Sequence, residues 1–206
     1  MRYNLFLILL YTTASWGQSD SLWELKEKGI ITLEQWYDLK LKSGYISNEG
    51  NGWVQFTDQI DINSDLYKSL KTKSGLIFYI PDKYQIIKKN GNRYIQAYLF
   101  NLSDSVVLIP RSDATILSVE NYLFVYNKWQ LIKENSKATC GNSYWMQKLE
   151  PNYYISVQFD NHDISLGNIK VKQKIKICIG GQVLESKEVW AMLNKNQLKL
   201  MANKGM

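Results

Sequence analysis

The sequence predicts a mainly β protein, an antiparallel β-sandwich that follows a small helical hairpin. The strongest signal is the alternation of apolar and basic side chains along residues 169–179. The basic positions are Lys170, Lys172, Lys174 and Lys176. Because successive side chains of a strand point to opposite faces, one face packs on a core and the other presents ammonium groups. After Trp53, turn residues recur at the spacing of roughly 8–12 residues that is typical of sandwiches.

Residues 1–17 have the features of a secretory signal peptide. Arg2 gives a basic start, and the apolar stretch at 5–11 is too short to cross a bilayer. Ser15 and Gly17 are small residues suited to the cleavage site. We therefore expect an exported protein, periplasmic or extracellular, with no transmembrane segment in the mature chain.

The expected order after the signal peptide is a helical hairpin at 18–44, a linker at 45–52, a β-sandwich domain at 53–193 and a C-terminal tail at 194–206. Within the sandwich domain, period-two patterns predict strands at 53–62, 76–81, 93–102, 106–109, 114–119, 122–132, 153–159, 170–179 and 183–190. The strand at 93–102 is apolar on both faces and should be central. Gly180 and Gly181 predict a two-residue hairpin turn.

The hairpin is predicted from its capping residues. Gly29 and Gly44 are placed to end two short helices in the left-handed conformation, and Thr32 with Gln35 forms a capping-box pattern. The run Leu25-Lys26-Glu27-Lys28-Gly29-Ile30-Ile31-Thr32, followed by Glu34-Gln35-Trp36, resembles the SHOCT module, a short helical hairpin. The resemblance covers residues 20–44 and implies a role in association with other chains.

A second resemblance covers residues 93–193. Its motifs are Tyr98-Leu99-Phe100-Asn101-Leu102-Ser103, Trp129, Cys140-Gly141-Asn142-Ser143-Tyr144, Leu149-Glu150-Pro151 and Gly167. This order resembles an immunoglobulin-like sandwich found in uncharacterised secreted proteins of the bacterial envelope. The resemblance implies an immunoglobulin-like fold and an envelope location, and it implies no reaction.

Several classes of function are disfavoured by composition and motifs. The net charge of +6 comes mostly from lysine, whereas specific readers of nucleic acid rely on arginine, so no nucleic-acid partner is expected. No phosphate-binding loop, dinucleotide fingerprint or nucleophile elbow is present. His162 is the only histidine; with Asp160 and Asp163 it suggests an Asx-rich turn more than a metal site. We expect a non-catalytic protein without cofactor or metal, although a carboxylate-based hydrolase stays open.

Cys140 and Cys178 are the only cysteines, and an exported protein meets oxidising conditions. Cys178 shares the parity of the lysines rather than that of the core. A disulfide between the two would lie outside the core, or a β-bulge near Gln173 would reverse the parity. The sequence leaves a disulfide and two free thiols as equal alternatives.

Two sets of side chains are candidates for binding. The lysines of 170–176 can attract an anionic polymer or glycan, or they can simply keep a sheet surface hydrated. Tyr144 and Trp145, with Tyr153, Tyr154 and Trp129, can stack on a ligand or belong to the core. The leading hypothesis is an exported adaptor that contacts a protein partner, and the alternative is a module that binds a carbohydrate or polyanion.

Overall fold

A computed structural model describes residues 50–68, 70, 73–134 and 143–204, together with 27, 29, 32, 35, 38–39, 42 and 44–47. The chain divides into two units, residues 1–45 and 46–206. The predicted signal peptide at 1–17, most of the hairpin and Cys140 lie outside the described residues.

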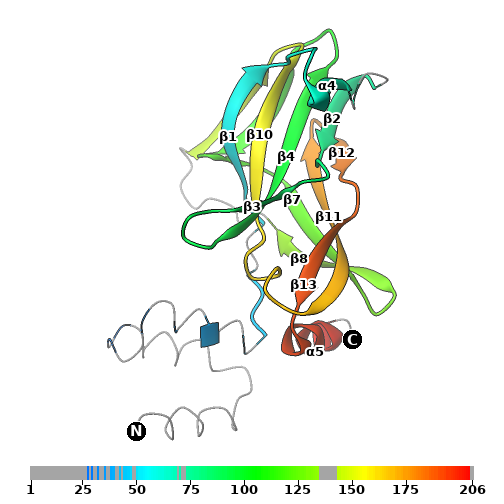
Figure 1. The fold of residues 1–206 in the computed structure, drawn as a ribbon. Coiled ribbons are helices and arrows are strands. Elements are labelled where there is room, and N and C mark those ends of the chain that lie inside the picture. The colour runs from blue at the N-terminus through cyan, green and yellow to red at the C-terminus, as the bar shows by residue number, and fades with distance from the viewer. Residues whose placement is uncertain are drawn as a thin grey trace, which may run out of the picture. The chain divides into compact units, whose positions relative to one another are not determined.

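The second unit is mainly β, and its strands form two antiparallel sheets (Figure 1). The eight-stranded sheet contains β1 (Gly52–Gln59), β2 (Gly75–Tyr79), β3 (Gln85–Ile87), β4 (Arg93–Leu102), β5 (Val107–Ser112), β6 (Thr115–Ile116), β9 (Tyr144–Leu149) and β10 (Tyr153–Asp160). The five-stranded sheet contains β7 (Val119–Val125), β8 (Lys128–Glu134), β11 (Ile169–Ile179), β12 (Gln182–Glu185) and β13 (Val189–Leu193). Among its described residues, this unit also has the helices α4 (Asp65–Lys68) and α5 (Lys195–Lys204).

The strand order explains where the core lies. The larger sheet runs β2-β4-β10-β1-β6-β5-β9 with β3 beside β4, and the smaller runs β12-β11-β7-β8 with β13 beside β11. One buried cluster takes side chains from both sheets, including Leu99 of β4, Val157 of β10 and Ile177 of β11. The prediction of a β-sandwich is therefore confirmed, and so is the central position of the strand at 93–102.

The hairpin turns follow from residues that adopt positive φ. Gly180 and Gly181 have φ of 57° and 81°, and they join Ile179 to its partner Gln182, as predicted. Tyr126 and Asn127 have φ of 51° and 59° and form the equivalent turn between β7 and β8. The prediction of one strand over 122–132 was therefore wrong, because two strands and a turn occupy that region.

Other strand boundaries differ from the prediction. Pro110 does not end its strand: its carbonyl accepts a hydrogen bond from the Leu117 amide at 3.0 Å, and β5 continues to Ser112. The region 183–190 divides into β12 and the start of β13 around Ser186, which is hydrogen-bonded to Ile175 in both directions. β9 was not predicted, because its residues lack the period-two pattern.

The β-bulge near Gln173, which was one of two alternatives considered for a disulfide, is absent. β11 pairs with β7 in unbroken register from Lys172 to Ile177. Gln173 therefore points inward, as Ile175 and Ile177 do. A register shift is found instead between β7 and β8, next to Asn121, and it turns Lys133 inward. A polar group therefore enters the interior from each of three neighbouring strands.

Local capping predictions are confirmed where their residues are described. The Thr32 amide donates to Gln35 Oε1 at 2.8 Å, and the Gln35 amide donates to Thr32 Oγ1 at 3.2 Å. Gly29 and Gly44 have φ of 66° and 97°, as helix ends require. In the second unit, Ser64 caps α4 by accepting from the Tyr67 amide at 3.1 Å. No helix among the described residues has both the length and the apolar character needed to span a bilayer.

Gly167 is the glycine whose missing side chain matters most for packing. A Cβ at this position would lie 2.0 Å from the Leu193 carbonyl carbon, because residues 167 and 168 donate hydrogen bonds to the β13 backbone. We expect Gly167→Ala to lower the free energy of unfolding by about 3 kcal/mol, measured by chemical denaturation. Gly91→Ala is the control, since its Cβ meets open space and only its φ of 83° opposes the change, at a cost of about 1 kcal/mol. Equal losses in the two variants would contradict the steric explanation.

Candidate binding face and a buried polar network

The lysines of β11 point away from the core and share their face with aromatic side chains. Across the sheet, Lys172 pairs with Trp190 of β13 on one side and Phe124 of β7 on the other. Phe124 in turn pairs with Trp129 of β8. We call this surface the lysine–aromatic face; its members are Lys170, Lys172, Lys174, Lys176, Tyr122, Phe124, Trp129, Leu131 and Trp190.

Three ammonium groups lie over aromatic rings of this face. Lys170 Nζ is 4.1 Å from the centroid of the Trp190 ring, and Lys174 Nζ is 4.4 Å from that of Trp129. Lys176 Nζ is 5.2 Å from the Tyr122 centroid. Each such cation–π contact contributes about 0.5–1 kcal/mol at an exposed site. The lysines therefore hold the aromatic rings in place.

Two carboxylates neutralise half of the charge of the four lysines. Lys172 Nζ lies 2.7 Å from Glu188, and Lys174 and Lys176 lie 3.0 and 3.1 Å from the two oxygens of Glu185. The hydrogen bond from Lys174, with further help from Lys176, lowers the pKa of the Glu185 carboxyl below its usual value. Only Lys170 of the four has no carboxylate partner among the described residues. The row of lysines is thus less cationic than its sequence suggests.

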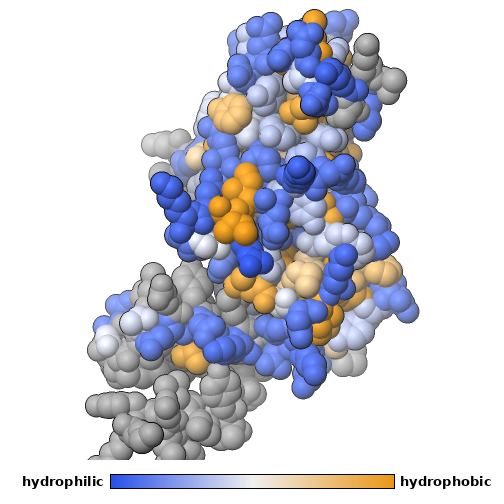
Figure 2. All heavy atoms as spheres, in the orientation of Figure 1, coloured by the Kyte–Doolittle hydropathy of each residue, from blue (hydrophilic) through white to orange (hydrophobic). Residues whose placement is uncertain are grey.

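Large apolar side chains remain exposed on the same face. Trp190 is 45% exposed, Leu131 46% and Phe124 36%. Figure 2 shows the molecule in the orientation of Figure 1, with β1, β10 and β4 in front. On this side the apolar atoms form separate areas within a hydrophilic surface, and one of these areas lies over β3. The lysine–aromatic face differs from such isolated areas because Trp129 and Phe124 have ring centroids 5.3 Å apart and adjoin Leu131.

The structure does not bring Tyr144 and Trp145 to the lysines. Both lie on β9, the edge strand of the other sheet. There the Arg111 guanidinium lies 5.0 Å from the Trp145 ring centroid, and Trp145 Nε1 donates to the Asp113 carbonyl at 3.1 Å. The predicted binding set is therefore divided between two sites.

Cys178 is exposed at the outward parity of the lysines and has no disulfide partner among the described residues. Because Cys140 lies outside those residues, a disulfide and two free thiols stay the two alternatives of the sequence. The lysine–aromatic face also brings together residues that were not predicted to share it, namely Glu185, Glu188, Phe124 and Trp190. Their parity was visible in the sequence, but their strand partners were not.

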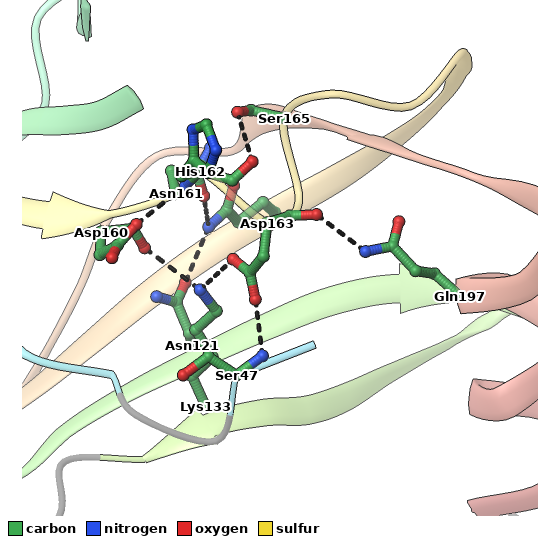
Figure 3. A network of polar contacts seen from close by, with 10 residues as sticks. Ser47, Asn121, Lys133, Asp160, Asn161, His162, Asp163, Ser165 and Gln197 are labelled. Carbon is green, nitrogen blue, oxygen red and sulfur yellow. Dashed lines mark hydrogen bonds and ion pairs between the residues drawn. The ribbon is translucent and has the colours of Figure 1, made fainter. Parts of the chain in front are cut away.

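A buried polar network lies at the inward face of β8 and β11 (Figure 3). The Lys133 side chain is 1% exposed, and its Nζ lies 2.5 Å from Asp163 Oδ1 and 3.3 Å from the Asp160 carbonyl oxygen. The Ser47 amide donates to Asp163 Oδ2 at 2.6 Å, and Gln197 Nε2 donates to the Asp163 carbonyl at 2.8 Å. The predicted linker is therefore bound to the sandwich at Ser47.

Amides extend this network toward β7. Gln173 Nε2 donates to Asn121 Oδ1 and to Asn161 Oδ1, each at 2.9 Å. Asn121 Nδ2 and Gln173 Oε1 are buried without a partner in the described part of the chain. The Asx turn predicted around His162 is present, since the His162 amide donates to Asp160 Oδ1 at 2.9 Å. Within the described ranges, no three His, Cys, Asp or Glu side chains gather as a metal site would require.

Comparisons with protein-family models, curated proteins and solved structures found no match for this chain. Its function must therefore be inferred from these two places in the fold.

The lowered pKa of Glu185 predicts a dependence of stability on pH. Its ion pairs stabilise the fold above the ordinary carboxyl pKa of 4.5, and that contribution is lost as pH falls through the lower folded-state pKa. Because both partners are partly exposed, we expect a loss of less than about 1 kcal/mol. Denaturation series at several pH values should show this loss in the wild type and not in Glu185→Gln. Glu150→Gln, at a carboxyl between β9 and β10 of the other sheet, should keep the wild-type profile. A Glu185→Gln profile identical to that of the wild type would contradict the assignment.

Proposed function

We propose that the chain is an exported, non-catalytic binding protein of the bacterial envelope that contacts a protein partner through the lysine–aromatic face. The observation that carries the proposal is the exposure of Phe124, Leu131 and Trp190 on a face whose lysines are already engaged. Aromatic side chains are enriched among the residues that dominate protein–protein binding energy. Glu185 and Glu188 with their lysines form a polar row between Trp190 on one side and Phe124 with Leu131 on the other.

The ion pairs favour a protein over an anionic polymer. A polyanion would have to displace Glu185 from two lysines and Glu188 from a third. The ring faces of Trp190 and Trp129 are also occupied by ammonium groups, which would compete with a sugar that stacks there. A protein surface can instead use the exposed apolar atoms and leave these pairs intact.

The sequence supports the rest of the proposal. The signal-peptide features of residues 1–17 support export, and the two-sheet architecture supports an immunoglobulin-like sandwich at 93–193. The capping box of Thr32 and Gln35 supports a SHOCT-like helical hairpin at 18–44 as a second region for association with other chains.

Site-directed photo-crosslinking tests the proposed face. We expect p-benzoylphenylalanine in place of Leu131 to crosslink a discrete envelope protein in the producing cells. The matched control is the same substitution at Leu108 of β5, which is 50% exposed and lies on the other sheet. Phe124→Ser should lower the affinity of the purified chain for that envelope protein about tenfold, which is the loss expected for truncating an aromatic interface residue.

Two results would overturn the proposal. One is the absence of a protein adduct at position 131, and the other is an identical adduct at 108 that persists in Phe124→Ser. Retention on an anionic glycan column that Lys170→Glu abolishes, without any protein adduct, would move the function to the carbohydrate or polyanion class.

A further inference from the structure

The buried network brings an amino group and a carboxyl group into direct contact. Lys133 Nζ lies 2.5 Å from Asp163 Oδ1, and the two side chains are 1% and 11% exposed. Their chain neighbours Ile132 and Ile164 belong to, or pack on, one apolar cluster. Burying an ion pair carries a desolvation cost that its attraction often fails to offset. A neutral covalent product would remove that cost.

We propose that Lys133 and Asp163 condense into an intramolecular isopeptide bond. One proton passes from the ammonium group to Asp163 Oδ1 along their contact, which gives a neutral amine and a neutral acid. The amine nitrogen then forms a bond to the Asp163 carboxyl carbon, and the bond from that carbon to Oδ1 breaks. Oδ1 leaves as water with a second proton from the amine. Nothing is oxidised or reduced, and the products are one amide and one water molecule.

The surrounding groups favour this step. The Ser47 amide, 2.6 Å from Asp163 Oδ2, donates to the oxygen that gains negative charge when the amine attacks. The Asp160 carbonyl, 3.3 Å from Lys133 Nζ, accepts from the amine and orients its lone pair. Figure 3 shows the amine held between these two aspartates. Fixed proximity of this kind replaces a bimolecular encounter by a far more probable intramolecular one.

The position of the bond gives it a structural role. Lys133 belongs to β8 of the five-stranded sheet, whereas Asp163 lies in the segment that connects β10 to β11. An amide between them would tie this connecting segment covalently to β8. The inference is independent of the binding face, which lies on the outward side of β11, β7, β8 and β13.

Peptide mapping of the purified full chain tests the inference. Trypsin cuts after lysine, so a chain without the isopeptide bond would give the separate peptides 129–133, 134–137 and 149–170. An acylated Lys133 blocks one cut, and we expect peptide 129–137 joined to 149–170 and lighter by one water. Fragmentation should place the link at Lys133 and Asp163. The proposal would be overturned if the separate peptides alone were detected, or if the link joined another pair of residues.

Two variants provide matched controls. Lys133→Arg keeps a cation but not a nucleophilic amine, and it should yield peptide 149–170 alone. Asp160→Asn keeps the carbonyl that accepts from Lys133 and should retain the link. A linked product in Lys133→Arg would assign the chemistry to a different lysine and overturn the proposal. If that variant does not fold, the wild-type map still decides.

Discussion

The two-faced strand β11 is the constraint on which the described sandwich depends. Ile175 and Ile177 are fully buried in the shared core, while the alternating lysines of the strand face outward. β11 pairs with β7 on one side and with β12 and β13 on the other, so four of the five strands of its sheet meet there. A shift of one residue would bury ammonium groups and expose the isoleucines, so the hydrophobic effect fixes the register of the sheet.

The same alternation organises the outward surface. Because the register is fixed, Trp190 and Phe124 are brought to opposite sides of Lys172, and Glu185 is brought to Lys176. Lys174 and Lys176 then each contact an aromatic ring and a carboxylate at once. This arrangement explains why a row of like charges is tolerated along one strand, and why it is a weaker anion site than its composition implies.

Sequence reasoning succeeded where the determining interactions are local. The alternation of β11, the Gly180-Gly181 turn and the Thr32 capping box all follow from residues within one element or turn. It failed where the direction of a side chain depends on the pairing with another strand. Nothing near Lys133 in the sequence shows that a register shift against β7 turns it inward, and the pairing of Lys133 with Asp163 spans 30 residues. A polar residue at the inward position 173 suggested a bulge, because the side chains that bind Gln173, those of Asn121 and Asn161, lie on other segments.

The pairing of β11 on both sides also bears on the energetics of recognition. Side chains on its outward face are held by cation–π contacts and ion pairs before any ligand arrives. A surface that is ordered in advance loses little rotational freedom on association, so less of the contact energy is offset by entropy. Among variants of such a preorganised surface, differences in affinity arise mainly in how long the complex lasts rather than in how fast it forms.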